Sequence, residues 1–230
     1  FNYATTHDED ISLGWGVEIA NIDTEASAGS LIRGTDTFLL SRAEIPGGTL
    51  VYLNGSVGAA VLNGYPLVND GYNWSFNTQQ SLEALGSLST FGKYRLSAAG
   101  YFKVDERGDA LAARVRYETT TGDVPNYEAP VIGPFIRGYT GVDHYAASGL
   151  TINTEARFMI DPEIGQFVLF FDAGKGWDDP TLKFSDLEYG YGAGVRLRTG
   201  HWIPIDILIY ADYAIGVDDN EFVVGIGQWF

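Results

Sequence analysis

Residues 11–20 read Ile-Ser-Leu-Gly-Trp-Gly-Val-Glu-Ile-Ala, so that every second side chain from Ile11 to Ile19 is large and apolar. The residues between them are small, polar or charged. A period of two places these two kinds of side chain on opposite faces of a β-strand. This stretch therefore predicts a strand with one apolar face and one polar face.

The same alternation returns in segment after segment, with turn residues between the segments. It predicts an all-β chain of about twelve antiparallel strands, with eleven clear segments and a twelfth that residues 1–6 could supply. The alternative is that these are the last strands of a larger barrel. The eleven predicted strands are 10–22, 27–42, 49–62, 71–84, 91–104, 109–119, 149–160, 166–176, 188–199, 205–216 and 221–230.

Two all-β architectures share this alternation and differ in which face meets water. A soluble sandwich buries its apolar face, whereas a transmembrane barrel turns it toward lipid. Three features favour the barrel: strands of about ten residues or more, short turns that alternate with long loops, and aromatic residues near the strand ends. We therefore predict an antiparallel transmembrane β-barrel. The aromatic residues assigned to strand ends are Tyr65, Tyr101, Tyr117, Tyr127, Tyr189, Trp202, Trp229 and Phe230.

The amino-acid composition excludes several classes of function. The 230 residues include 14 Lys and Arg, 30 Asp and Glu and no Cys, which gives a net charge of −16. The lack of Cys excludes a disulfide scaffold, a Cys-ligated metal site and a thiol nucleophile. The negative charge argues against nucleic-acid binding, which needs clustered Lys and Arg. Because no catalytic constellation stands out from the strand pattern, we expect no enzymatic activity, no cofactor and no metal site.

The longest predicted loop, 119–148, carries an Arg-Gly-aromatic motif made of Arg137, Gly138 and Tyr139. An Arg followed by Gly is by itself a common turn. A guanidinium also offers a planar fork of donors to carboxylates, and a partly dehydrated environment strengthens such bonds. The motif therefore becomes informative if acidic residues lie on the strands beside it.

The two strands after this loop carry such residues. Glu155 lies on the polar face of the first strand, six positions after Gly149. The second strand reads Phe-Phe-Asp-Ala-Gly over residues 170–174, with Asp172 on its polar face and Gly174 at its end. The arginine motif is thus followed by two acidic strand motifs in a fixed order.

The chain ends with Phe-Val-Val-Gly-Ile-Gly-Gln-Trp-Phe over residues 222–230. Apolar residues alternate here and lead to a terminal aromatic residue. This pattern is similar to the C-terminal signal by which outer-membrane barrels are recognised for insertion. The residues that form it are Phe222, Val224, Ile226 and Phe230.

In this order and spacing, the motifs resemble the C-terminal barrel of the bacterial surface antigen superfamily of outer-membrane assembly and secretion proteins. The resemblance covers residues 135–230, and residues 1–134 match only in their barrel-like pattern. The family usually places periplasmic domains ahead of a sixteen-stranded barrel, whereas fewer strands and no such domain are found in this sequence. The expected organisation is a single barrel domain over residues 1–230.

The resemblance implies that the long loop folds back into the lumen of the barrel. It places Arg137 against Asp172, with Glu155 beside it and Gly174 in the same strand motif as Asp172. Two other interpretations stay open: Arg137 is a solvated loop residue, or the ion pair is a brace that holds the loop and has no role in transport.

The resemblance also implies a bacterial or organellar outer-membrane barrel that inserts or exports polypeptides. The expected mechanism is a seam between the first strand and the short last strand, 221–230, which opens so that an incoming strand pairs with an exposed edge. The expected partners are the lipid bilayer, substrate polypeptides and periplasmic or lipoprotein accessory subunits. Nucleic acid is not among them.

A second hypothesis is a passive small-solute pore or a membrane anchor, such as the barrel of a patatin-like autotransporter. In that case the arginines on the polar faces of the strands would favour small anions. These residues are Arg114, Arg116, Arg157, Arg196 and Arg198.

Overall fold

The computed structural model describes residues 10–22, 48–64, 66–139, 146–178, 187–200, 205–217 and 219–228. These residues form ten β-strands and three short 3-10 turns. The strands are β1 (Asp10–Ile22), β2 (Gly48–Asn63), β3 (Asp70–Ser81), β4 (Phe91–Lys103), β5 (Ala110–Gly122), β6 (Ser148–Asp161), β7 (Gly165–Trp177), β8 (Glu188–Arg198), β9 (Leu208–Gly216) and β10 (Asn220–Ile226). The turns are η1 (Glu83–Leu85), η2 (Asn126–Glu128) and η3 (Gly133–Phe135).

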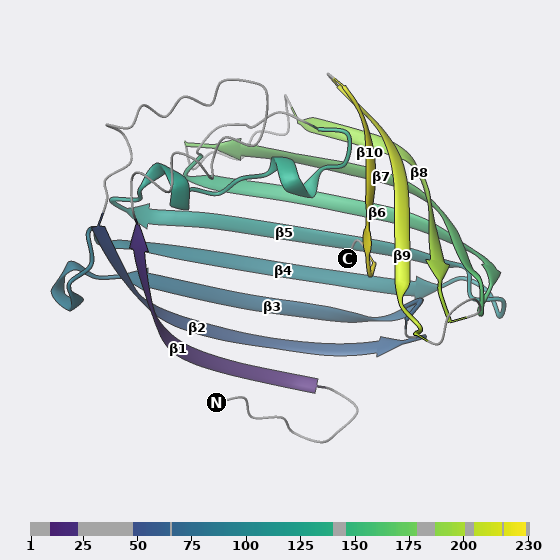
Figure 1. Ribbon diagram of the computed structural model, residues 1–230, viewed down its shortest axis with the longest axis horizontal. Coiled ribbons are helices and arrows are strands. Elements are labelled where there is room, and N and C mark those ends of the chain that lie inside the picture. Colours follow the sequence, from purple (N-terminus) through teal and green to yellow (C-terminus); the bar gives the residue numbers. More distant parts are fainter. Residues whose placement is uncertain are drawn as a thin grey trace.

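All ten strands belong to one antiparallel sheet in which each strand pairs with its neighbours in the sequence. Figure 1 shows that this sheet is strongly curved, from the long strands β1–β5 round to the steeply inclined β8–β10. The curvature gives the sheet a concave and a convex face. Within the described ranges, β1 pairs with β2 and β10 pairs with β9, and the two end strands do not pair with each other.

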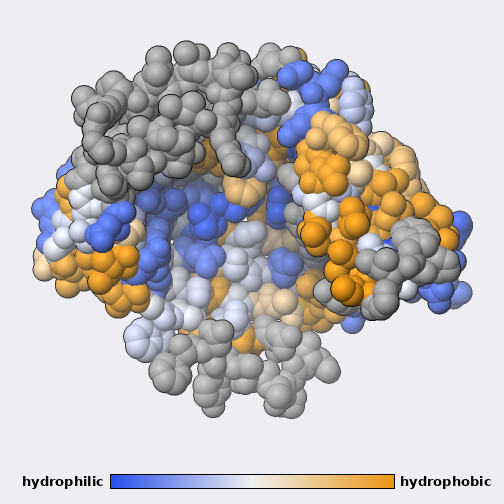
Figure 2. Space-filling view, in the orientation of Figure 1, coloured by the Kyte–Doolittle hydropathy of each residue, from blue (hydrophilic) through white to orange (hydrophobic). Residues whose placement is uncertain are grey.

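The two faces of the sheet differ sharply in polarity. Apolar side chains point out of the convex face, where Trp15 is 70 % exposed and Ile226 is 75 % exposed. Polar and charged side chains gather in the central hollow, as Figure 2 shows. A soluble sandwich would have the opposite arrangement, because apolar surface is costly in water. The predicted antiparallel transmembrane β-barrel is therefore confirmed, with lipid on the convex side and a polar lumen on the concave side.

The ends of several predicted strands differ from the structure. The last strand stops at Ile226 rather than at residue 230, because Gly227 adopts a φ of +96° that breaks the extended backbone. The long loop begins after Gly122 rather than at residue 119, because Thr119 to Gly122 continue the ladder with β4. The predicted strands at 1–6 and 27–42 lie outside the described residues.

The aromatic residues assigned to strand ends do not all face lipid. Tyr189 is exposed on the convex face, and its ring stacks on Phe171 of the neighbouring strand. Tyr101, however, is buried on the lumen side, packed with Val68 and Ala99. Tyr101 does lie near the end of β4, as predicted, but it is not part of an interfacial belt because it shares the parity of the polar face of β4. Tyr65, Trp202, Trp229 and Phe230 lie outside the described residues.

Most connections at one end of the barrel are shorter than those at the other, although β8–β9 (199–207) is as long as β3–β4 (82–90) and β9–β10 covers only 217–219. The connections β2–β3, β4–β5, β6–β7 and β8–β9 lie at one end, which we call the short-turn end. The loops β3–β4, β5–β6, β7–β8 and β9–β10 lie at the other end, and β5–β6 is the longest of them. Figure 1 shows the described part of this loop, with η2 and η3, lying over the concave face of the sheet.

In the part of the chain that the structure describes, no helix has both the length and the apolar character needed to cross a membrane.

Candidate functional site in the barrel lumen

The motif loop between β5 and β6 is shaped by its own backbone hydrogen bonds. The N–H of Ile136 donates to the carbonyl of Gly133 at 3.1 Å, and the N–H of Tyr139 donates to the carbonyl of Ile136 at 3.2 Å. Gly138 has a φ of +81°, which favours glycine because it has no Cβ. Ile132, Ile136 and Tyr139 pack together on the apolar side of this turn. The motif is therefore a compact turn and not a solvated loop.

Arg137 is buried against three strands of the lumen wall. Its Nε and Nη2 donate to the two carboxylate oxygens of Asp172 on β7, at 2.7 and 3.0 Å. Its Nη1 donates to Glu155 on β6 at 2.8 Å and to Asp212 on β9 at 2.9 Å. The backbone N–H of Arg137 donates to Asp172 as well, at 3.2 Å. Every nitrogen of this guanidinium thus contacts a carboxylate.

Two more arginines complete the charge balance of this cluster. Arg157 on β6 donates to Glu155 through Nε and Nη2, at 2.8 and 2.7 Å. Arg196 on β8 donates to Glu155 at 3.0 Å and makes a bidentate pair with Asp212. The cluster has three charges of each sign, and we call it the lumen network. Its members are Arg137, Arg157, Arg196, Glu155, Asp172 and Asp212.

Burial makes this network sensitive to the loss of any member. Taking charges out of water is costly, and the cost is offset only when every charge has a partner of the opposite sign and good geometry. Burial by itself lowers the pKa of the Arg137 guanidinium, but the hydrogen bonds that it donates to Asp172 and the charge of Glu155 raise it above its usual value. Arg137 therefore stays charged across the physiological pH range.

Aromatic rings and an amide support the loop from both sides. The guanidinium of Arg137 lies 3.6 Å from the centroid of the Phe170 ring, and that of Arg116 lies 3.8 Å from the ring of Phe135 in the loop. Asn153 on β6 donates to the carbonyl of Phe135 at 2.7 Å and accepts from Arg114 at 2.9 and 3.0 Å. The loop is thus held by stacking and hydrogen bonds in addition to the ion pairs.

Glycines on the lumen wall make room for the motif. A Cβ on Gly190 of β8 would overlap the carbonyl oxygen of Arg137, and one on Gly216 of β9 would overlap the carbonyl oxygen of Gly138. A Cβ on Gly174 of β7 would lie 2.9 Å from the side chain of Ile136. Backbone can approach backbone this closely only where side chains are absent.

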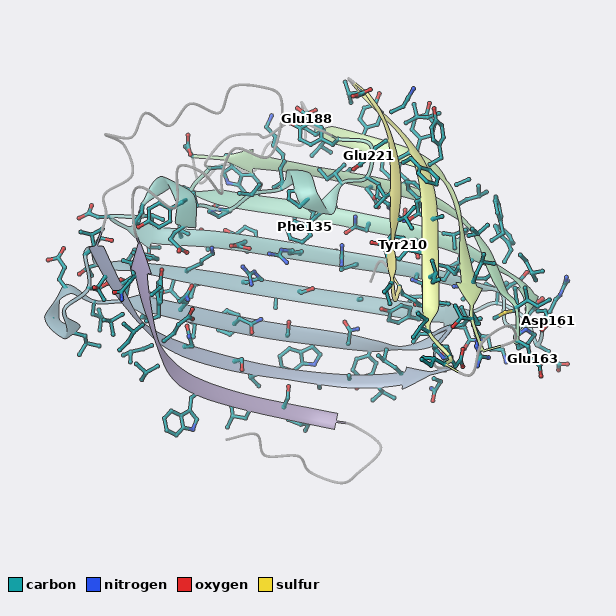
Figure 3. The ribbon with its side chains drawn as sticks, viewed as in Figure 1. Phe135, Asp161, Glu163, Glu188, Tyr210 and Glu221 are labelled. Atoms are coloured by element: carbon teal, nitrogen blue, oxygen red, sulfur yellow. The ribbon has the colours of Figure 1, made fainter. Side chains whose placement is uncertain are left out.

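The loop also contacts the last strand. The N–H of Gly138 donates to the carboxylate of Glu221 on β10 at 3.0 Å. Figure 3 shows Glu221 at the same end of the barrel as Phe135 and Glu188, whereas Asp161 and Glu163 lie at the opposite end. The motif is therefore tied to β10 as well as to β6, β7 and β9.

A second anchor holds the start of the loop on the other side of the lumen. Glu128 in η2 accepts from the hydroxyl of Tyr52 on β2 at 2.9 Å and pairs with Lys93 on β4 at 3.6 Å. Glu118 on β5 joins the same group, because it pairs with Lys93 at 3.3 Å and with Arg95 at 2.8 Å. The loop thus reaches from the wall of β2 and β4 to the wall of β6, β7 and β9.

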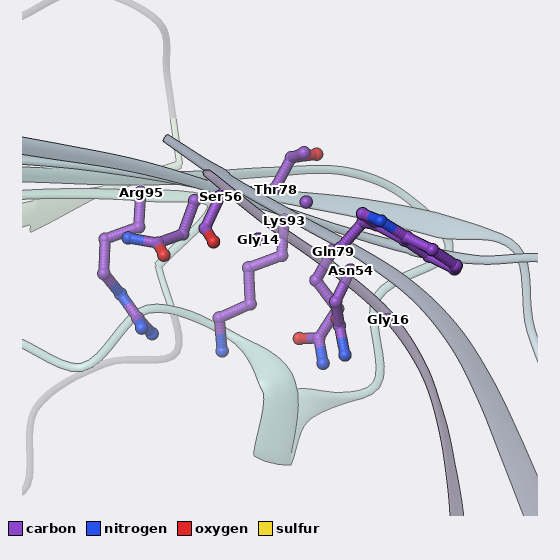
Figure 4. A pocket seen from close by; sticks show the side chains of 11 residues that line it. Gly14, Gly16, Asn54, Ser56, Thr78, Gln79, Lys93 and Arg95 are labelled. Carbon is purple, nitrogen blue, oxygen red and sulfur yellow. The ribbon is translucent and has the colours of Figure 1, made fainter. Parts of the chain in front are cut away.

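Next to this second anchor, the wall of β1–β4 contains a polar hollow of about 380 Å³. Two rows of side chains line it, because Asn54 pairs with Gln79 and then Lys93 across the sheet, and Ser56 pairs with Asn77 and then Arg95. Figure 4 shows these side chains projecting into one space, with Lys93 and Arg95 close together. The residues that line it are Gly14, Trp15, Gly16, Asn54, Gly55, Ser56, Asn77, Thr78, Gln79, Lys93 and Arg95.

The structure brings together most of the residues singled out from the sequence. Arg137, Asp172 and Glu155 are in direct contact, and Gly174 packs against the loop beside them. Phe222, Val224 and Ile226 point out of the convex face of β10, whereas Phe230 lies outside the described residues.

Sequence reasoning missed the third carboxylate of the motif arginine and its tie to β10. Asp212 has the parity of the polar face of β9, but its distance from Arg137 follows from the register of two more strand pairs. Glu221 is predicted only as the first residue of the last strand, 221–230. Only the folded loop reveals that its carboxylate accepts from Gly138.

The described residues contain no group of three or more His, Cys, Asp or Glu side chains arranged to hold a metal ion. The three carboxylates of the lumen network instead have arginine partners.

The fold and the lumen site define a class of protein: a transmembrane β-barrel whose β5–β6 loop is folded into the lumen and held there by a buried arginine. The comparison with protein families agrees with this. The Omp85 superfamily domain matches residues 49–230, so the chain belongs to the Omp85 superfamily. The predicted relationship to the bacterial surface antigen barrels is thereby confirmed, and the protein belongs to the outer membrane.

A solved structure shares the fold. BamA from Haemophilus ducreyi lacking POTRA domains 1-3 superposes with a TM-score of 0.64 at 15 % sequence identity. The match covers 96 % of this chain and 51 % of that chain, so the present chain spans about half the length of this relative. No curated protein matches the sequence.

Proposed function

We propose that this chain is the working barrel of an outer-membrane assembly or translocation factor, which inserts polypeptides into the outer membrane or exports them across it. The proposed activity is not enzymatic. It consists of presenting the edge of a strand to an incoming polypeptide and of closing the lumen with a docked loop. The substrates are polypeptides, and the proposed partners are the lipid bilayer and periplasmic or lipoprotein accessory subunits.

The observation that carries this proposal is the one-sided pairing of β10. This seven-residue strand pairs with β9, and no other strand in the described part of the chain adjoins its second edge. An edge with free N–H and C=O groups is a template for another strand. In the hydrocarbon core water cannot satisfy these groups, so a partner strand there is favoured strongly.

The lumen loop supports the same function. Arg137 and its carboxylates hold the loop against β6, β7 and β9, and the contact between Gly138 and Glu221 links it to the strand with the open edge. A docked loop therefore restrains β10, and its release would free that strand. This supports a role for the ion pair beyond that of a passive brace.

A passive anion pore has weaker support. Of the five arginines that would attract anions, Arg157 and Arg196 are neutralised in the lumen network, and Arg116 pairs with Glu118 at 2.8 Å. Arg114 donates to Asn153, and Arg198 pairs with Asp206. In the described part of the lumen, these five arginines therefore do not form the ring of uncompensated cations that anion selectivity needs.

Cysteine cross-linking tests the proposal directly, because the chain has no native Cys. We would place single cysteines by Phe222→Cys or Val224→Cys and supply an outer-membrane barrel polypeptide with one cysteine in its last strand, arrested during insertion. The expected result is a disulfide-linked adduct at these positions on β10.

Val115→Cys on β5 is the matched control. Val115 also points toward lipid, but its strand has partners on both sides. Adducts at Val115 as abundant as those on β10 would show mere proximity in the membrane. Ion conductance in the absence of any β10 adduct would instead favour the pore.

A further inference from the structure

A second line of contacts leads from the lumen network to the short-turn end of the barrel. Arg157, which is 1 % exposed, holds Glu155 with its Nε and Nη2. Its Nη1 points away from the network and donates to the carbonyl of Val68 at 2.9 Å and to Oε1 of Gln228 at 2.7 Å. One guanidinium thus connects the carboxylate that holds the motif arginine with a residue just beyond the last strand.

Gln228 is held in the lumen by the backbone as well as by Arg157. The positive φ of Gly227 turns the chain away from the line of β10, and the N–H of Gly227 donates to the carbonyl of Leu208 at 2.7 Å. The side-chain amide of Gln228 then donates to the carbonyl of Pro66 at 2.9 Å. Gln228 therefore bridges Arg157 and the turn between β2 and β3.

This β2–β3 turn is itself packed into the lumen. Leu67 is 3 % exposed and packs with Met159 on β6 and Leu208 on β9. Val68 is 7 % exposed and packs with a second group of residues on β4 and β5, Ala99, Tyr101 and Ala112. The turn thus packs against both sides of the lumen at the short-turn end. Its carbonyl groups accept hydrogen bonds there: that of Val68 from Arg157, and that of Pro66 from Gln228.

The last strand is consequently held by one side chain at each end. Glu221 at its start accepts from the motif loop at Gly138, and Gln228 past its end accepts from Arg157. Both ties lead to the same buried network, because the two oxygens of Glu155 serve Arg137 and Arg157 respectively. In such a network the position of one charge depends on all the others.

We propose that Arg157 and Gln228 are positioning residues that couple the C-terminal end of the chain to the lumen loop, so that releasing β10 loosens the loop and docking the loop holds β10. This deepens the proposed function, on which it rests only in assigning β10 as the strand that receives a polypeptide. The coupling arises because Gln228 orients Arg157, Arg157 orients Glu155, and Glu155 is a partner of Arg137. Coupling of this kind is reciprocal by thermodynamic necessity.

A spin label in the loop tests the coupling without any polypeptide substrate. Val131→Cys places the label on an exposed residue of the loop, in the full chain reconstituted in lipid vesicles. Gln228→Leu removes the hydrogen bonds of Gln228 with Arg157 and Pro66, and neither of these partners lies in the loop. The expected result is a rise of about fivefold in the ratio of mobile to docked label, at the lower end of measured couplings between sites.

Two further variants sharpen the measurement. Gln228→Glu keeps an acceptor for Arg157 and loses the donor to Pro66, so the label is expected to stay docked. Asn63→Leu is the matched control, because Asn63 makes an exposed amide hydrogen bond to Asp70 at 3.3 Å beside the same turn. It is expected to leave the label docked.

Three results would overturn the coupling: an unchanged spectrum for Gln228→Leu, an equal rise for Asn63→Leu, or a Gln228→Glu spectrum as mobile as that of Gln228→Leu. Heat-modifiable migration in electrophoresis verifies that each variant is a folded barrel. If Gln228→Leu does not fold, Arg157→Lys takes its place, since Lys keeps the charge but has fewer donors, and a docked label would then count against the proposal. The spectra are recorded without a polypeptide substrate. A failure of the cross-linking experiment on β10 would therefore count against the proposed function and not against this coupling.

Discussion

The walls formed by β1–β4 and by β6–β9 both present polar residues to the lumen, but the two walls differ in how far these residues are buried and paired. On the β6–β9 wall, the charged side chains of the lumen network are buried and paired, and the loop docks on them. On the β1–β4 wall, Asn, Gln, Ser and Lys side chains line an open hollow and remain partly exposed. The same kind of strand, with the same alternation, thus gives a wall of buried, paired charges in one half and a partly exposed polar wall in the other.

The difference shows that burial, and not residue type, sets what a polar group contributes. A charge that stays hydrated gains little from a partner, typically below about 1 kcal/mol. A buried charge without a partner costs several times more. Matched substitutions on the two sides, in the wall itself or in the loop docked on it, should therefore have unequal effects, and three pairs can be compared.

The largest difference is expected between Arg137→Ala and Arg95→Ala. Removing Arg137 leaves buried carboxylates without their shared partner, at a cost of about 3–5 kcal/mol in the free energy of unfolding. Removing Arg95 leaves Glu118 with Arg116 and Lys93, at a cost of less than about 1 kcal/mol.

Urea unfolding in lipid vesicles, followed by Trp fluorescence, measures both values. Limited proteolysis should show cleavage of the loop in Arg137→Ala while the barrel itself stays folded. Equal effects of the two variants, or a loop as resistant as in the wild type, would show that the network does not hold the loop.

The second pair is Gly190→Ala and Gly16→Ala. A methyl group at residue 190 overlaps the loop backbone at Arg137, and overpacking of this kind costs about 1–3 kcal/mol. Gly16 has no atom within 4 Å of its Cβ position, so alanine there should raise stability by about 0.5–1 kcal/mol.

The same unfolding experiment compares the two alanine variants, and loop proteolysis separates a displaced loop from a weakened sheet. Greater loop cleavage is expected in Gly190→Ala alone. If Gly16→Ala also exposes the loop, the lumen wall of β1 contacts more of the chain than the described residues show.

The smallest difference is expected between Asn153→Ala and Asn77→Ala. Asn153 is fully buried and connects Arg114 with the carbonyl of Phe135, so its loss should cost about 1–3 kcal/mol. Asn77 is half-buried and donates to Ser75 at 3.4 Å, so its loss should change stability by less than about 0.5 kcal/mol.

Differential scanning calorimetry of the two Asn variants in the same detergent provides this comparison. A loss of stability in Asn77→Ala equal to that in Asn153→Ala would mean that the hollow is more tightly packed than its exposure indicates.

Much of the barrel could be predicted from the sequence, because the period of two is a local property of each strand. The stretch from Ile11 to Ile19 shows it without any knowledge of neighbouring strands. The choice of lipid for the apolar face followed from strand length and from the pattern of short and long connections. Tyr101 lies near a strand end, as predicted, but its parity places its ring in the lumen and not at the lipid interface.

The site was predicted only where sequence motifs mark it. Arg137, Glu155 and Asp172 lie in motifs of the family, so their proximity could be expected. Asp212 and Gln228 have no such mark. Their distances from the network depend on the pairing register of β7–β9 and on the turn at Gly227, which act together over the whole sheet.

The sequence alone thus determined the all-β class, the polarity of each face and the residues of the motif loop, because side-chain alternation and turn composition are encoded locally. Only the tertiary structure decided which charges are buried, how the three arginines share three carboxylates, and that the end of the chain meets the same network. These properties depend on the curvature and register of the sheet and on the exclusion of water by the folded loop, and no single segment of the chain contains them.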